Sequence, residues 1–159
     1  MPGTTAVGKR VIWGEETMPS SKRKVTRQAR ELARTAAFRT ELRRFLHRVE
    51  AATLGAGLTP QRYDLLLMIK AAADRSESST VSRLCTDLDL RQTAVTELVK
   101  RSEDAGLVRR AQSADDGRVY EISLTSEGEA RLVRVFNALT DDRNAFVDGF
   151  RELSDLFHA

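Results

Sequence analysis

A β-hairpin pattern directly follows two short helical patterns, and this order constrains the fold more than any other feature of the chain. Within residues 81–105, apolar side chains recur every three or four positions, which predicts two amphipathic helices joined by a short turn. Residues 107–110 then have strand character, residues 113–118 contain an Asp-Gly turn pair, and residues 119–124 alternate with period two. Helix, turn, helix and hairpin in this order predict a winged helix-turn-helix.

Longer helical patterns flank this central segment on both sides. One begins at Thr26 and ends near the glycines at 55 and 57, and a second opens at Thr59-Pro60, where threonine suits the cap and proline the first helical position. After the hairpin, Thr125 or Ser126 is expected to cap a fifth helix, and a sixth follows from about Asp141. The fold is therefore expected to be mainly α, with a small β-hairpin wing.

The apolar pattern also predicts which side chains pack inside. We expect the second helix to be central, Leu90 to fill the gap between the two short helices, and Tyr120, Ile122 and Leu124 to line the buried face of one strand. Cys85 lies on one helix face with Val81, Leu84 and Leu88, which favours a buried small hydrophobe over a redox sensor. The residues expected on the core face of the second short helix are Ala94, Val95, Leu98 and Val99.

Composition argues against several classes of protein. One cysteine excludes an internal disulfide, and together with His47 and His158 it cannot complete a four-ligand zinc site. The acidic pairs Asp115-Asp116 and Asp141-Asp142 lie at a turn and a helix start, where acidic residues are common for structural reasons. We expect no enzyme, cofactor or metal.

No apolar run approaches the roughly 20 residues that span a bilayer, and no secretory signal is evident, so a cytoplasmic protein is expected.

Charge is distributed unevenly along the chain. The net charge is only +3, but residues 1–57 hold 12 Lys/Arg against 5 Asp/Glu, whereas residues 111–159 hold 5 against 10. A basic front half favours a polyanionic partner. The alternative is a charged helix face that simply contacts solvent.

The second short helix carries polar side chains suited to DNA. With its apolar residues turned inward, the outward side holds Gln92, Thr93, Thr96, Lys100 and Arg101. Gln can pair with an adenine edge, Thr with thymine, and Lys or Arg with phosphate or guanine. The alternatives are an ordinary polar surface and, for the two cations, ion pairs with Glu97 or Glu103 at helical spacing.

The hairpin tip adds a cation at one end of this surface. Arg118 suits insertion into a narrow minor groove, although a solubilising role at the tip is the alternative. Asp116 is expected to orient Arg118 through a charge-assisted hydrogen bond.

These motifs resemble the MarR family of bacterial transcription regulators from Leu58 to about Leu139. The residues that carry the resemblance are Leu58–Asp64, Leu88–Thr96, Glu103–Arg110, the wing residues Asp116-Gly117-Arg118, Ile122–Thr125 and Gly128. The resemblance covers roughly half the chain by motif and nearly all of it by the order of elements. Two positions depart from it: Arg91 replaces a Ser/Thr/Asn-type cap and adds a candidate phosphate contact, and Ser102 replaces a leucine.

The resemblance implies a homodimer that places two helices in successive major grooves of double-stranded DNA. It also implies a palindromic operator, repression, and release by a small aromatic acid. The expected organisation is a flexible arm (1–24), a dimerisation helix (25–57), a winged helix-turn-helix DNA-binding lobe (58–125) and C-terminal dimerisation helices (126–159). The aromatic tail independently favours a dimer, because Phe146, Phe150, Leu153, Leu156 and Phe157 are too much apolar surface for one isolated helix.

An effector pocket and a different function stay open. Arg44, His47 and Tyr63 offer a cation, an imidazole and an aromatic wall for an acidic effector, with Trp13 of the arm as a loose aromatic. A packed or interfacial role is the alternative for these side chains. The alternative function is a winged-helix module that binds proteins without binding DNA.

Overall fold

The computed structural model describes residues 27–72, 76–113 and 117–158, with side chains through Arg151. The arm expected at residues 1–24 lies outside the described residues. The elements run in the order α1 (Arg27–Gly55), α2 (Pro60–Lys70), β1 (Ser78–Ser79), α3 (Val81–Asp87), α4 (Gln92–Asp104), β2 (Val108–Gln112), β3 (Tyr120–Leu124), α5 (Ser126–Ala138) and α6 (Thr140–His158). The expected mainly α fold with a small hairpin wing is confirmed.

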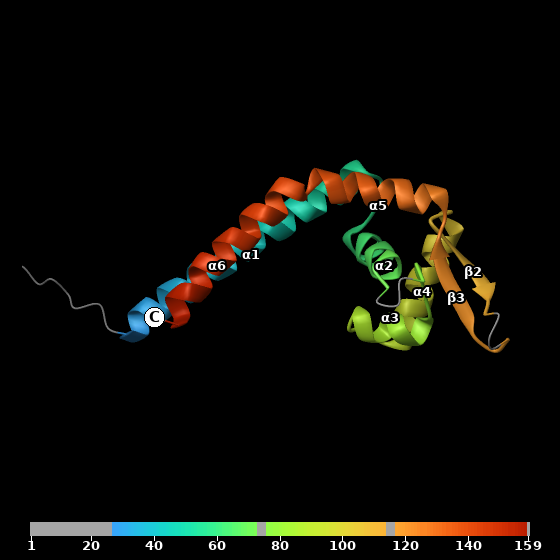
Figure 1. Ribbon diagram of the computed structural model, residues 1–159, viewed down its shortest axis with the longest axis horizontal. Helices are drawn as coiled ribbons and strands as arrows, with labels where there is room; N and C mark the ends of the chain where they lie inside the picture. The colour runs from blue at the N-terminus through green and yellow to red at the C-terminus, as the bar shows by residue number, and fades with distance from the viewer. Residues whose placement is uncertain (1–26, 73–75, 114–116, 159) are drawn as a thin grey trace, which may run out of the picture.

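Helices α1 and α6 lie side by side and extend away from a lobe formed by α2–α4 and the sheet (Figure 1). The rings of Phe45 and Phe146 stack with centroids 4.8 Å apart, and those of Phe38 and Phe150 meet edge to face at 5.7 Å. An ion pair of 2.6 Å joins Arg48 of α1 to Asp142 of α6. These contacts hold the helix pair together within one chain.

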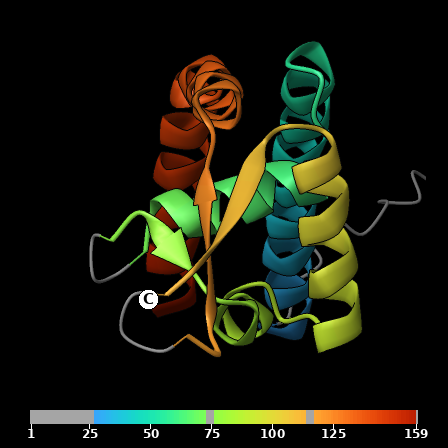
Figure 2. The same cartoon turned by 90° about the vertical axis from the view of Figure 1, so that its right-hand side faces the viewer.

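The sheet has three antiparallel strands in the order β1-β3-β2 (Figure 2). The sequence predicts the hairpin β2–β3 but not β1. Strand β1 has two residues, in which Ser78 pairs with Ser123 and Ser79 with Ile122. Two residues are too short for a periodic signal, so this strand exists only through its partner.

The core forms around α2, as expected for a central helix. Leu65, Leu66 and Ile69 of α2 are fully buried, and Leu84, Val95, Leu107 and Ile122 from the surrounding elements are buried with them. The cap of α2 also follows expectation: the Thr59 hydroxyl accepts a hydrogen bond from the backbone N–H of Arg62, with Pro60 in the first turn.

Four side chains expected inside lie outside or at the margin. Leu90 is 39% exposed, and it follows Asp89, which lies just after α3 with a positive φ of 51°. Tyr120 is 56% exposed, since β3 extends past the core while Ile122 on the same face is buried. Ala94 is exposed on α4, and Cys85 is half-buried against the core rather than fully enclosed.

Two helices end in the same left-handed glycine turn. Gly57 follows α1 with φ 70°, and the N–H of Leu58 donates to the Thr53 carbonyl at 2.9 Å. Gly106 follows α4 with φ 70°, and the N–H of Leu107 donates to the Ser102 carbonyl at 2.9 Å. Both are Schellman-type stops, each followed by a buried leucine.

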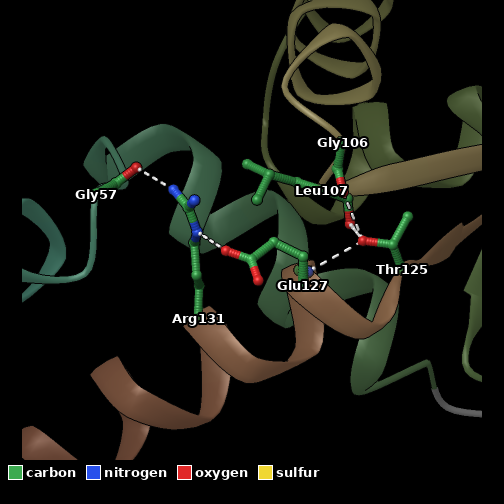
Figure 3. Close-up of polar contacts among 7 residues, drawn as sticks. Gly57, Gly106, Leu107, Thr125, Glu127 and Arg131 are labelled. Carbon is green, nitrogen blue, oxygen red and sulfur yellow. Dashed lines mark hydrogen bonds and ion pairs between the residues drawn. The ribbon is translucent and has the colours of Figure 1, made fainter.

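The first two turns of α5 contact both of these glycine turns (Figure 3). The Thr125 hydroxyl donates to the Gly106 carbonyl at 2.6 Å and accepts from the N–H of Gly128 at 3.1 Å. The Arg131 guanidinium donates from Nη1 to the Gly57 carbonyl at 3.1 Å. We call this group of contacts the α5 junction.

Gly128 allows the closest approach in the α5 junction. A Cβ at this position would lie 2.0 Å from the Leu107 carbonyl oxygen, which is backbone and is held in the α4–β2 turn. Helix α5 can therefore lie against this turn only if residue 128 has no side chain.

We expect Gly128→Ala to lower the free energy of unfolding by about 3 kcal/mol, because the added methyl group forces α5 away from the turn. Gly149→Ala is the matched control, since a Cβ there meets nothing within 4 Å and alanine favours a helix by about 1 kcal/mol. Urea unfolding of both variants measures the effect. Equal stability of the two variants would contradict the close approach.

Candidate nucleic-acid interface

Helix α4 is amphipathic, with its polar side turned outward. Val95 and Val99 are buried at 0% and 1% exposure and fasten one side of the helix to the core. The opposite side carries Gln92, Thr93, Thr96, Lys100 and Arg101, all exposed. We call these five residues the α4 outer face. The structure thus brings together on one surface five of the side chains that the sequence predicts for DNA contact.

The start of α4 lacks a side-chain cap, as the departure at Arg91 predicts. Arg91 occupies the cap position with extended backbone and makes no capping hydrogen bond, whereas Thr59, Thr80 and Thr125 cap their helices. The exposed Arg91 side chain therefore adds a cation where the helix presents its N–H groups.

Ser102 fits its position near the end of α4 without a leucine. The side chain is fully buried, and its hydroxyl donates to the Leu98 carbonyl at 2.8 Å. The buried hydroxyl is therefore satisfied within the helix.

The two acidic residues of α4 have different partners. Glu97 pairs with Arg101 at 2.8 Å, and both side chains are more than half exposed, so the pair contributes little stability. Glu103 pairs with Arg110 of β2, which ties the wing to the end of α4. Of the alternatives left open for Arg101, the helical ion pair forms in this structure.

The wing tip carries the remaining predicted side chains. Arg118 is exposed just after the turn, and the Gln112 amide donates to the Gly117 carbonyl across it. Asp116 lies outside the described residues, so its hydrogen bond to Arg118 stays a prediction.

Arg62 is a neighbour of the α4 outer face that the sequence did not reveal. Its guanidinium extends from α2 and donates to the Arg101 carbonyl at 3.1 Å, across 39 positions of sequence. No local pattern reports such a contact. Between α2 and α4 lies an open cleft of about 500 Å³, whose walls include Leu90 and Ala94. The cleft explains the exposure of these two apolar side chains.

The effector candidates do not form one cluster. Arg44 and His47 are exposed on α1, and Arg44 pairs with Glu41 at 2.5 Å. Tyr63 is buried in α2 at 6% exposure; burial raises the pKa of its phenol, and the Arg143 cation partly opposes that rise. No hydrogen bond joins Arg44, His47 and Tyr63 in the described part of the chain, and Trp13 lies outside it. The effector pocket stays a prediction.

Within residues 27–72, 76–113 and 117–158, no group of three His, Cys, Asp or Glu side chains is placed to hold a metal ion. No helix in those ranges is long and apolar enough to cross a membrane.

The fold and this surface define a class of protein. A helix pair whose second member presents a polar face, followed by a hairpin that is fastened to it, is a winged helix-turn-helix. Residues 56–119 match the sequence model of the MarR family. This match agrees with the resemblance that the motifs of the chain show to that family.

A known protein is similar to part of this chain in sequence. The chain is 30% identical over 79 residues to the HTH-type transcriptional repressor MdtR of Bacillus subtilis (strain 168), covering 50% of this chain and 48% of MdtR. The chain thus spans about half the length of this curated relative.

Solved structures share the fold over a longer stretch. AbsC, a MarR family transcriptional regulator from Streptomyces coelicolor, superposes with a TM-score of 0.65 at 24% identity, covering 82% of this chain and 88% of AbsC. A cysteine-to-serine mutant of MarR from E. coli, crystallised in complex with operator DNA, superposes with a TM-score of 0.63 at 17% identity. That match covers 84% of this chain and 96% of the other.

The Glu103–Arg110 pair makes stability depend on pH. The hydrogen-bonded Arg110 guanidinium holds the pKa of Glu103 below its ordinary value of 4.5. A carboxyl with a lowered folded-state pKa stabilises the fold above the ordinary value, and this contribution is lost as pH falls through the folded-state pKa.

We therefore expect Glu103→Gln to lower the free energy of unfolding at pH 7 by less than about 1 kcal/mol, because the pair is partly solvated. The difference from the wild type should vanish below the lowered pKa. Denaturant titrations between pH 7 and pH 3 measure it, and in an Arg110→Gln background the substitution should have no effect. A difference that persists in acid would contradict the role of this pair.

Proposed function

We propose that this chain is a transcription regulator that binds double-stranded DNA as a homodimer through the α4 outer face and the wing. The observation that carries the proposal is the exposed polar face of α4, Gln92 to Arg101, on a helix fastened to the core by Val95 and Val99. The MarR structure solved with operator DNA supports it by likeness of fold.

Different side chains of this surface are suited to different parts of DNA. Gln92, Thr93 and Thr96 suit base edges in the major groove, because amides and hydroxyls read the donor and acceptor pattern there. Arg91, Lys100 and Arg101 suit phosphates, and Arg118 with Asp116 suits the minor groove beside them. Arg62 adds a further cation next to this surface.

Two exposed apolar stripes support the homodimer. Leu32, Leu46 and Leu54 of α1 are between 53% and 64% exposed, although α1 packs its other side on α6. Along α5 and α6, Val133, Phe136, Val147 and Phe150 are between 44% and 49% exposed. Stripes of this length are unusual on a monomer, and a second copy of the chain would cover them. Leu153, Leu156 and Phe157 lie outside the described side chains.

A palindromic operator follows from the twofold symmetry of a homodimer. A twofold dimer places two α4 helices on half-sites about 34–36 Å apart, which matches successive major grooves. The likeness to the repressor MdtR favours repression over activation. A small aromatic acid that binds one dimer shape more tightly would release DNA, with Arg44, His47, Tyr63 and Trp13 as its candidate contacts.

We expect Arg118→Ala to weaken binding to a duplex of the chain's own promoter region about tenfold, because a charged groove contact is lost. Binding of the wild type should fall steeply with salt. Arg134→Ala is the control, since Arg134 is exposed on α5, lies outside the proposed interface and loses the same charge. Fluorescence anisotropy at several salt concentrations measures both variants.

Absence of DNA binding by the wild type at low salt would favour the alternative function, a winged-helix module for protein binding. Equal loss in both arginine variants would remove the wing from the mechanism.

We expect Val147→Glu to weaken dimerisation at least about 30-fold, since a charge would enter the apolar stripe of α6. Ala145→Glu is the matched control, because residues two apart on a helix point to nearly opposite sides. Sedimentation equilibrium of both variants measures the dimer dissociation constant. A wild type that stays monomeric at micromolar concentration would refute the homodimer.

A further inference from the structure

We infer that Arg131 is a positioning residue, whose side chain sets the angle between the winged lobe and the helices α1, α5 and α6. The effect on DNA recognition rests on the proposed function, but the geometric role does not. The inference comes from three observations within the α5 junction (Figure 3).

Arg131 makes two bonds of different range. Its Nε pairs with Glu127 at 2.6 Å, one turn earlier on the same helix. Its Nη1 donates to the Gly57 carbonyl at 3.1 Å, 74 positions away in sequence. The local pair holds the guanidinium in a fixed orientation, so the long-range bond has a defined direction.

The acceptor of this long-range bond lies at the joint between α1 and α2. Gly57 has φ 70°, and a Cβ there would lie 2.9 Å from Nη1 of Arg131. The guanidinium therefore occupies the space that a side chain at position 57 would need. Position 57 needs glycine for its backbone conformation and also for this contact.

The same helix holds the second joint. Thr125 donates to the Gly106 carbonyl at 2.6 Å, where the chain leaves α4 for the wing. Helix α5 thus fastens the end of α4 through Thr125 and the turn between α1 and α2 through Arg131. The orientation of the α4 outer face relative to α1 therefore depends on both polar contacts.

Apolar packing alone would leave this angle poorly defined. Leu132 of α5 and Leu139 at its C-terminal cap are buried in the core with Ala56 and Leu58 of the joint. Burial of apolar surface is not directional, however. A hydrogen bond weakens steeply when its angle changes. Loss of Arg131 should thus leave the fold intact and widen the range of angles.

The direct test is a distance distribution between spin labels at Arg43 of α1 and Lys100 of α4, both exposed. The full-length chain carries Cys85→Ser, and labelled chains are diluted with excess unlabelled chain so that distances within one chain are measured without DNA. We expect Arg131→Ala to broaden the distribution at least about 1.5-fold relative to the wild type. Arg134→Ala, with the same loss of charge on the same helix, should leave the width unchanged.

A second pair of variants separates the contact from backbone strain. Gly57→Ala and Gly106→Ala both place alanine at φ 70°, but only at Gly57 does the new Cβ meet the guanidinium. Gly57→Ala should broaden the distribution, and adding Arg131→Ala to it should change little more. Arg131→Lys keeps the charge beside Glu127 without the second donor nitrogen, so it replaces the alanine variant if that variant unfolds.

A DNA-binding experiment tests whether the angle between the winged lobe and the helix pair affects recognition. Promoter duplexes with one base pair inserted at the centre should bind the wild type at least tenfold more weakly, and Arg131→Ala should discriminate threefold or less. A width unchanged by Arg131→Ala, or broadened equally by Arg134→Ala, would overturn the positioning role. If no duplex binds the wild type, the proposed function fails, and the label distances still decide the role of Arg131.

Discussion

The contact between the Leu107 carbonyl and the bare α-carbon of Gly128 is the constraint on which the arrangement of the molecule depends. It presses the start of α5 onto the turn that ends α4, with no space for even a methyl group. The Thr125 hydroxyl completes the contact by capping α5 and bonding Gly106 at once. Because α5 runs on into α6, this contact relates the polar face of α4 to the long helix pair α1–α6, together with the bond of Arg131 to Gly57.

Much of the fold follows from local signals that the sequence displays. Thr59 and Thr125 sit at helix starts with the expected capping bonds, and the Asp-Gly turn lies between two strands that pair as expected. Strand β1 was not predicted, because two residues are too few to show an alternating pattern of apolar and polar side chains. The prediction for Leu90 was wrong because this side chain lines the cleft between α2 and α4, which forms only when distant segments pack together.

The candidate site divides in the same way. Helical periodicity was enough to place Gln92, Thr93 and Thr96 on one outward side, because a single helix determines it. The contacts of Arg62 and Arg131 join residues 39 and 74 positions apart, and no spacing rule covers such distances. Their acceptors are backbone carbonyls at helix ends, which side-chain patterns do not mark. From the sequence alone, arginines of this kind are therefore interpreted as ordinary surface residues.

The length of α1 has a mechanical consequence for the α5 junction. At 29 residues it is a rod about 43 Å long, held by its own turn at one end. A rotation of about 5° at that end displaces the other by about 4 Å, somewhat less than the rise of one helical turn. The helix pair therefore works as a lever. Loss of one guanidinium contact can change the angle at the α5 junction too little to alter the core, and the displacement that results increases along the length of the helices.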